Sequence, residues 1–83
     1  MRPRNQDAAY LRAFGDAVRQ ARERAGLSQE ELGFRADLDR TYISGVERGA
    51  RNPTVRSILT IAEALATRPS RLLGKAETRL PRP

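Results

Sequence analysis

Residues 27–49, LSQEELGFRADLDRTYISGVERG, contain the signals for two short helices joined by a tight turn. Ser28 precedes the first helical run and Glu31 follows three residues later, which is the spacing of a capping box. Asp39 is a favoured N-cap residue for the second helix. Gly49 suits the left-handed conformation that ends many helices. The segment therefore predicts a helix, a turn and a second helix.

The second helix is expected to have an apolar side and a polar side. Ile43 and Val46 lie three residues apart and can face a core, whereas polar side chains occupy most other positions. Two short helices, a turn of about three to four residues and a polar start to the second helix form the helix-turn-helix pattern. This pattern predicts DNA binding through the second helix.

Three short segments resemble the helix-turn-helix family of phage Cro and cI repressors, also called the Xre family. They are LSQEEL at 27–32, YIS at 42–44 and VERG at 46–49. The run LDRTYISGVERGARNPT, residues 38–54, is similar to the controller proteins of restriction–modification systems, which are small dimeric regulators. The family's pattern covers residues 14–73. The resemblance implies an all-α, five-helix lambda-repressor-like DNA-binding domain with the helix-turn-helix at helices 2 and 3.

The start of the second of these helices can present side chains to base edges in the major groove. Arg40 matches the family's base-reading position and can pair with the O6 and N7 of guanine. Thr41 can offer a methyl group to thymine or a hydroxyl to a base or phosphate. Tyr42 can either pack at the side of the helix or reach a phosphate, and both interpretations stay open. The predicted base-reading residues are Arg40, Thr41, Tyr42 and Ser44.

Phosphate contacts fix the register of a protein on DNA without reading its sequence. Gln29 lies at the exposed start of the first helix, where free amides favour anions. Arg35 is a surface arginine that can equally be only solvated. The resemblance to controller proteins implies that Arg51 and Asn52 contact the DNA backbone or bases. The predicted phosphate-binding residues are Gln29, Arg35, Arg48, Arg51, Asn52 and Thr54.

The resemblance also implies structural roles inside the domain. In the family, residues matching Arg22 and Glu47 form an ion pair, which would tie the first helix of the domain to the third. Gly33 replaces the alanine that is usual there, and mid-helix glycine costs roughly 0.5–1 kcal/mol relative to alanine. Asp37 replaces a frequent glycine in the turn. Asp tolerates the left-handed region better than most residues, so a positive φ is expected at Asp37.

The sequence divides into a flexible N-terminal arm (1–5), the DNA-binding domain (6–74) and a flexible C-terminal tail (75–83). Helical periodicity begins at residue 6 and continues to residue 25. A fourth helix follows Thr54, and its expected core face includes Val55 and Leu59. Ser70 is expected to cap a short fifth helix, which Gly74 would end.

Composition narrows the possible functions. The chain of 83 residues has room for one domain, carries a net charge of +6, and contains neither cysteine nor histidine. This excludes disulfides, zinc fingers and a Ser-His-Asp triad, so no cofactor, metal site or enzyme is predicted. A basic domain suits a polyanion such as double-stranded DNA. No apolar run approaches the roughly 20 residues of a membrane span, and no signal peptide is evident, so a cytoplasmic location is expected.

One helix-turn-helix contacts only a few base pairs, so a homodimer on a palindromic operator is expected. Leu72 and Leu73 are adjacent and point about 100° apart on a helix, so one can face the core and the other a partner. The predicted dimer interface comprises Ile61, Leu72 and Leu73.

The sequence thus predicts a sequence-specific DNA-binding transcriptional regulator. A restriction–modification controller, a phage-type repressor and an antitoxin all remain open. An antitoxin or an adaptor would have a protein as its main partner. The polar, arginine-containing start of the second helix argues against an adaptor, because such a protein would not need that group of side chains.

Overall fold

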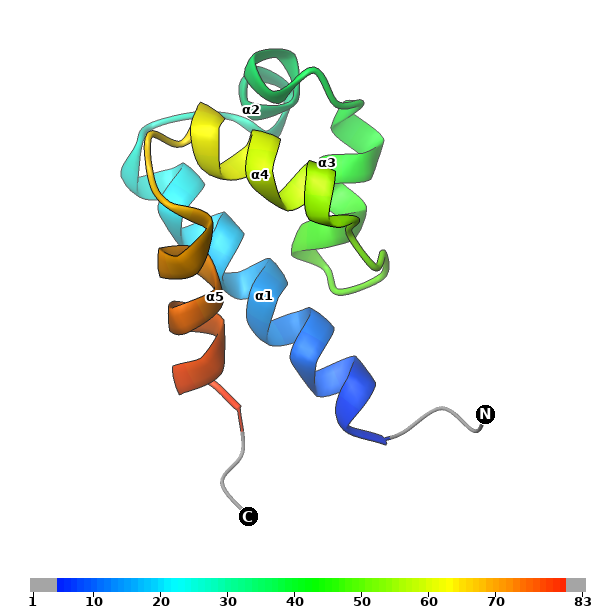
Figure 1. Cartoon of the computed structure of the whole chain (residues 1–83). Helices are drawn as coiled ribbons and strands as arrows, with labels where there is room; N and C mark the ends of the chain where they lie inside the picture. Colours follow the sequence, from blue (N-terminus) through cyan, green and yellow to red (C-terminus); the bar gives the residue numbers. More distant parts are fainter. Residues whose placement is uncertain (1–4, 81–83) are drawn as a thin grey trace.

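Residues 5–80 of the protein fold into a bundle of five α-helices (Figure 1). The computed structural model describes residues 5–80, in which α1 spans Asn5–Arg24, α2 Gln29–Ala36, α3 Arg40–Glu47, α4 Val55–Ala64 and α5 Pro69–Thr78. Residues 5–80 contain no β-strand, which confirms the predicted all-α fold. Most of the expected N-terminal arm, residues 1–4, lies outside the described residues, and Asn5 already belongs to α1.

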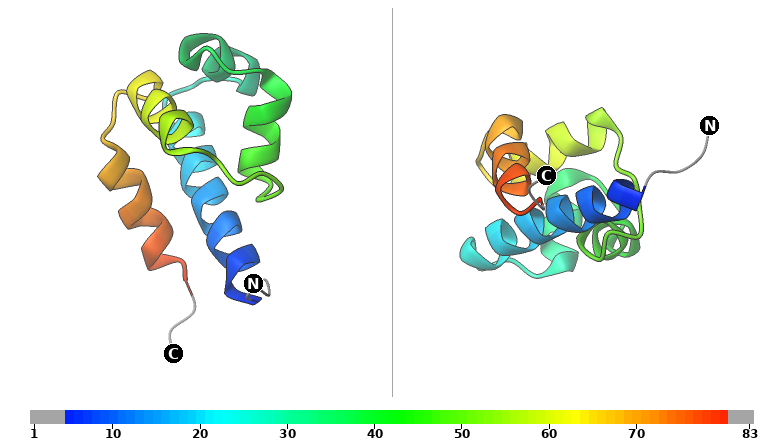
Figure 2. Two further views of the ribbon diagram at one scale, coloured as in Figure 1. Left: turned by 45° about the vertical axis from the view of Figure 1, so that its right-hand side comes forward. Right: turned by 90° about the horizontal axis from the view of Figure 1, so that it is seen from below.

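The helices form two halves. In the views of Figures 1 and 2, α1 and α5 lie side by side and run in opposite directions. The other half consists of α2, α3 and α4, and α3 also packs against α1. The fully buried large side chains come from all five helices: Val18, Leu32, Ile43, Val46, Ile61 and Leu72. Because one core joins both halves, the position of α3 is fixed relative to the rest of the domain.

The rotation of α4 differs from the prediction. Val55 and Leu59 were expected in the core, but they are 73% and 51% exposed. Ile61 is fully buried instead. Ser57 also faces inward, and its hydroxyl accepts a hydrogen bond of 3.2 Å from the Tyr42 hydroxyl on α3. The inward face of α4 is thus centred on Ser57, Ile61 and Ala62, with Ile58 and Leu65 packed at its edge, so it is turned from the face that apolar spacing alone favours.

The fifth helix is longer than predicted, and its expected start and end were both wrong. Pro69 is its first residue, so Ser70 is not its N-cap. The helix continues through Gly74 to Thr78, so residues 75–78 are not a tail. Ala76 is buried in the core, and this contact offsets the low helix propensity of the glycine. Residues 81–83 of the expected tail lie outside the described residues.

Candidate nucleic-acid interface

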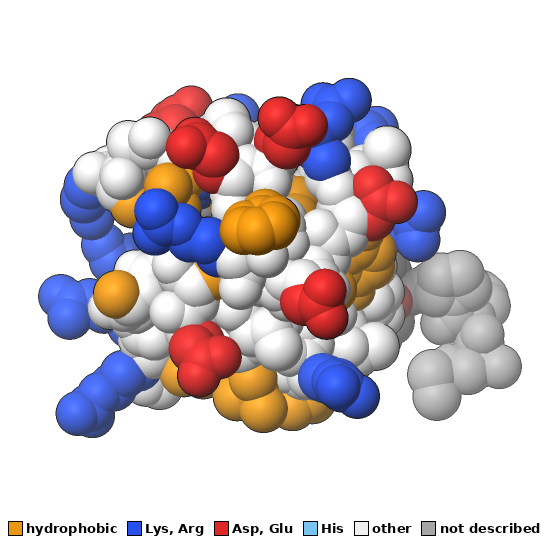
Figure 3. All heavy atoms as spheres, turned by 90° about the horizontal axis from the view of Figure 1, so that it is seen from above, with side chains coloured by type: hydrophobic (Ala, Val, Ile, Leu, Met, Phe, Trp, Pro, Cys, Tyr) orange, Lys and Arg blue, Asp and Glu red, His pale blue; other side chains and the backbone are white. Residues whose placement is uncertain are grey.

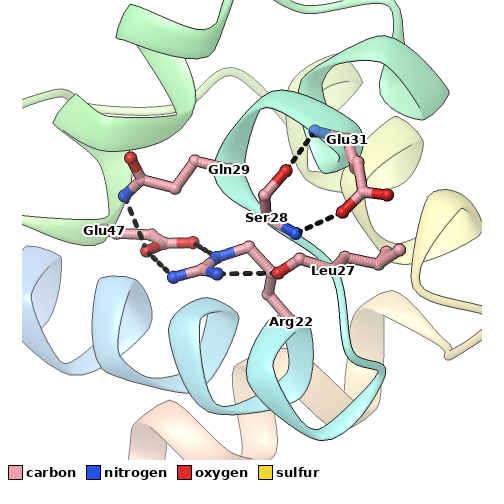
Figure 4. A network of polar contacts seen from close by, with 6 residues as sticks. All are labelled: Arg22, Leu27, Ser28, Gln29, Glu31 and Glu47. Atoms are coloured by element: carbon pink, nitrogen blue, oxygen red, sulfur yellow. Dashed lines mark hydrogen bonds and ion pairs between the residues drawn. The ribbon is translucent and has the colours of Figure 1, made fainter.

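The start of α2 has the predicted capping box (Figure 4). The Glu31 backbone N–H donates to Ser28 Oγ at 3.0 Å, and the Ser28 backbone N–H donates to Glu31 Oε1 at 2.8 Å. These hydrogen bonds satisfy amides that a helix start would leave free. Two hydrogen bonds with Ser28 lower the pKa of Glu31. The bond with the Ser28 backbone has the larger effect and the bond with the Ser28 side chain the smaller one. The box therefore fixes the start of α2 while Glu31 is ionised.

The turn between α2 and α3 requires two unusual residues. Asp37 has φ of 58°, which confirms the expected left-handed conformation. The Leu38 N–H then donates to the Gly33 carbonyl at 2.8 Å, closing the turn. A Cβ atom at Gly33 would lie 2.6 Å from the Leu38 carbonyl oxygen. Glycine at position 33 is thus a packing requirement of this turn, and not only a weak helix residue.

A buried ion pair connects the C-terminal part of α1 to the end of α3 (Figure 4). Arg22 Nε and Nη2 donate to the two carboxylate oxygens of Glu47 at 2.6 Å and 3.0 Å. Arg22 Nη1 also donates to the Leu27 carbonyl at 2.8 Å. The hydrogen bond to Glu47 raises the pKa of Arg22, and the guanidinium stays charged. The ion pair that the family resemblance implied is present and holds α3 against α1.

Gln29 joins this network, because its side-chain amide donates to Glu47 Oε1 at 3.0 Å (Figure 4). The contact holds the Gln29 side chain beside the end of α3. Its amide oxygen has no hydrogen-bond donor among residues 5–80. Gln29 is therefore positioned partly by the scaffold, and its predicted phosphate contact stays a prediction.

The first turn of α3 presents polar side chains to solvent. Asp39 Oδ1 accepts a hydrogen bond of 3.1 Å from the Thr41 backbone N–H and so acts as the predicted N-cap. Arg40 and Thr41 are exposed, and Arg40 forms no ion pair with any carboxylate in residues 5–80. Ser44 is half-buried one turn later and accepts a hydrogen bond from Arg48 Nε at 3.4 Å. The buried side of the same helix carries Ile43 and Val46, so Arg40, Thr41 and Ser44 lie on its outward side. These three residues form the polar row of α3.

Tyr42 is held between α3 and α4. Its ring is half-buried against the core, and its hydroxyl donates to Ser57 Oγ on α4. The Thr54 hydroxyl donates to the same Ser57 oxygen at 3.1 Å and accepts from the Ser57 backbone N–H at 3.0 Å. The geometry favours the packing interpretation of Tyr42 over a direct contact with bases.

The loop between α3 and α4 contains three predicted phosphate-binding residues. Arg51 and Asn52 are exposed, and the Arg51 guanidinium lies over the Tyr42 ring with its central carbon 5.7 Å from the ring centre. Thr54 is the N-cap of α4, so its hydroxyl already has a structural role. The loop thus brings Arg51 next to the polar row of α3.

Arg35 lies on the outer face of α2. It lines a shallow depression together with Glu30, Glu31 and the side chain of Phe34, which is 88% exposed. Figure 3, which views the molecule from above, shows acidic and basic side chains interspersed around exposed hydrophobic groups. The carboxylates beside Arg35 weaken the positive potential there, so it is the least favourably placed of the predicted phosphate-binding arginines.

The predicted dimer residues have different environments. Leu72 is 1% exposed and packs in the core, whereas Leu73 is 48% exposed, which is the inward and outward division expected from their spacing. Ile61 is fully buried within the protomer. Its predicted place in a dimer interface was wrong, because the rotation of α4 directs it into the core and leaves Leu59 outside.

Among residues 5–80, no cluster of acidic side chains could hold a metal ion. Within the same range, no helix combines the length and the apolar character needed to cross a membrane.

Comparison with known proteins gives the family. The model of the helix-turn-helix family matches residues 18–72. This chain belongs to the helix-turn-helix family. Control protein C.BamHI of Bacillus amyloliquefaciens is 49% identical over 61 residues, which cover 72% of this chain and 75% of that protein. Control protein C.SmaI of Serratia marcescens is 45% identical over 62 residues, covering 75% of this chain and 74% of that protein.

Solved structures of helix-turn-helix proteins have the same fold. The restriction–modification controller protein C.AhdI from Aeromonas hydrophila has a TM-score of 0.74 and 48% identity, covering 75% of this chain and 94% of that one. The controller protein C.Esp1396I, solved as a tetramer with its natural 35 base-pair operator, has a TM-score of 0.76 and 31% identity, covering 84% and 92%. These matches confirm the predicted resemblance to controller proteins.

Two buried residues that support the helix-turn-helix surface are not predicted by the sequence analysis. Ser57 positions Tyr42, but no local pattern distinguishes it from a solvent-facing serine. Gly45 lies inside α3 and is buried beneath the Arg51 side chain. A glycine within a short amphipathic helix was an available signal for such a close approach.

Proposed function

We propose that this helix-turn-helix protein is a sequence-specific DNA-binding transcriptional regulator that places α3 in the major groove. The observation that carries the proposal is the exposed, unpaired Arg40 at the first position of α3, beside Thr41. The first residues of a recognition helix are those that reach base edges. A guanidinium without a carboxylate partner is free to form a bidentate contact with guanine.

The remaining polar residues divide by role. Ser44, about one turn further along α3, borders the same groove face, and Tyr42 supports the helix from the α4 side. Phosphate contacts would come from both ends of the surface, through Gln29, Arg35, Arg48, Arg51, Asn52 and Thr54. Replacement of Arg40 by alanine should cost about 1–3 kcal/mol on the preferred site and relax specificity at one base pair.

The protein would act as a homodimer on a palindromic operator. Half-sites about one helical turn, roughly 34 Å, apart suit two copies related by a two-fold axis. Leu73 is the predicted interface residue that remains exposed, and Leu59 is a second exposed leucine on the neighbouring helix. The controller relatives, one of which is solved as a tetramer on its operator, support this assembly.

Within the regulators, we assign the chain to the restriction–modification controllers, on the identity with C.BamHI and C.SmaI. Such a regulator works where the cell's DNA lies, so a cytoplasmic location follows. The proposed activity is binding, without a catalytic step or a cofactor.

DNA binding is tested by titrating a labelled mixed-sequence duplex at rising salt. If each protomer neutralises three phosphates through Arg35, Arg48 and Arg51, a dimer should give a log–log slope of about −5. Arg48→Ala should reduce this slope by about 2 per dimer, whereas the control Arg71→Ala on α5 should leave it unchanged. If the wild-type protein does not bind this duplex even at low salt, about 50 mM, the proposal is contradicted.

A further inference from the structure

The Arg51 side chain folds back across α3, the helix that precedes its loop. Its guanidinium carbon lies 5.7 Å from the centre of the Tyr42 ring, within the range of a cation–π contact. Its aliphatic stem lies over Gly45, where a Cβ atom would be 2.6 Å from Arg51 Cγ. Tyr42 and Gly45 are three residues apart and so share one face of the helix. The stem and the charged head of Arg51 therefore cover consecutive positions on that face.

No residue larger than glycine at position 45 is compatible with this position of the Arg51 side chain. Carbon atoms pack at about 3.5–4.0 Å, so a methyl group on residue 45 would displace the Arg51 stem. All three atoms nearest to that methyl belong to the Arg51 side chain, which is flexible. Gly15 is different, because a Cβ atom there would lie 2.4 Å from the Val46 carbonyl oxygen. Substitution of Gly15 would move backbone, whereas substitution of Gly45 would move one arginine.

The Tyr42 ring, on which the arginine stacks, is itself held in place. The Tyr42 hydroxyl donates to Ser57 Oγ at 3.2 Å, and Ser57 is only 8% exposed. Within residues 5–80, Arg51 has no carboxylate partner. Its charge is thus held in one place beside the polar row of α3 while remaining available to a phosphate or a base. Such prior ordering reduces the conformational entropy lost on binding.

We infer that Gly45 is a positioning residue for DNA recognition: its missing side chain lets Arg51 lie across α3 and stack on Tyr42, which aims the guanidinium at the DNA. Gly45 itself touches no DNA in this account and acts only through Arg51. The inference rests on the proposed function, because Arg51 must contact DNA for its position to matter.

The first test is made without DNA. In the wild-type protein, the ring current of Tyr42 should shift the NMR signals of the Arg51 side chain upfield. Gly45→Ala should remove this shift and should leave the melting temperature no lower, because alanine favours a helix. Gly74→Ala on α5, where a Cβ atom meets nothing within 4 Å, is the matched control and should leave the Arg51 signals unchanged.

The second test is a double-mutant cycle on the duplex that the wild type enriches from a random library. Gly45→Ala and Arg51→Ala should each weaken binding by about tenfold, the effect of one charge-assisted hydrogen bond. The double variant should bind no more weakly than Arg51→Ala alone, since both changes remove the same contact.

Three results would overturn the inference: Gly45→Ala binding as tightly as the wild type, a double variant with the full product of the two losses, or a Gly45→Ala protein that does not fold. The last would show that backbone, and not the arginine, occupies the space. A wild-type protein that enriches no duplex would instead refute the proposed function, and the NMR comparison would still test the arrangement of Arg51.

Discussion

Glu47→Ala removes the carboxylate that joins three helices of the domain. That carboxylate accepts hydrogen bonds from Arg22 Nε, from Arg22 Nη2 and from Gln29 Nε2, and the Glu47 side chain is 3% exposed. The Arg22 side chain is 12% exposed and would be left with only its bond to the Leu27 carbonyl. The substitution therefore leaves a largely desolvated charge without its partner.

Breaking a buried pair in this way costs about 3–5 kcal/mol, and the partial solvent access of Arg22 reduces the expected loss to about 2–4 kcal/mol. At about 0.05–0.15 kcal/mol per residue, the whole domain has roughly 4–12 kcal/mol of stability. For a domain of this size, the loss corresponds to a fall in melting temperature of about 10–30 °C. Urea unfolding, followed by circular dichroism at about 222 nm, measures the change in free energy directly.

The chain offers a matched control. Arg19 and Asp16 form an ion pair of 3.1 Å on α1, with side chains 49% and 43% exposed. Asp16→Ala should cost less than about 1 kcal/mol, because exposed pairs contribute little. The double variant Arg22→Met with Glu47→Leu should recover most of the Glu47→Ala loss, since no charge is left buried. If Glu47→Ala costs no more than Asp16→Ala, the account of this network is wrong.

Three further predictions concern the other parts of the domain. Glu31→Gln should lower the melting temperature at pH 7, and the difference from the wild type should shrink as the pH falls below about 4.5. The pKa of Glu31 is depressed in the folded state, so its contribution is fully present above the ordinary value near 4.5 and is lost as the pH falls through the folded value. Gly33→Ala should destabilise the protein by about 1–3 kcal/mol through its clash with a carbonyl of the turn, whereas Gly74→Ala, with open space around it, should stabilise by about 0.5–1 kcal/mol; equal effects in urea unfolding would refute both assignments. Leu73→Glu should give a monomer in sedimentation velocity under conditions where the wild type is a dimer, without lowering helix content. An unchanged dimer would remove Leu73 from the interface.

The helix-turn-helix unit was predictable because its signals are local. The capping box of Ser28 and Glu31, the left-handed Asp37 and the N-cap Asp39 each depend on residues within a few positions, and all are present as predicted. The exposed start of α3, with Arg40, follows from the same local pattern. The sequence therefore predicted the helix-turn-helix and the outward orientation of the polar side of α3.

The parts that failed depend on contacts between distant segments. The rotation of α4 buries Ile61 in a core made by all five helices and places Ser57 within reach of Tyr42, fifteen positions away, and the apolar spacing of α4 alone reveals neither contact. The length of α5 depends on burial of Ala76 against the core, which outweighs the glycine two residues before it. The same rotation moved Ile61 from the expected interface to the interior. Sequence periodicity describes one helix at a time, whereas these features are decided by its neighbours.

The most direct test of the central proposal is selection of bound duplexes from a random library at near-physiological salt, with wild type and Arg40→Ala in parallel. The wild type should enrich a palindrome whose half-sites lie about one helical turn apart and contain a guanine. The Arg40→Ala variant should no longer select guanine at that position. Binding without enrichment of any sequence, or an identical preference in the two proteins, would contradict the assignment of α3 as the helix that reads DNA through Arg40.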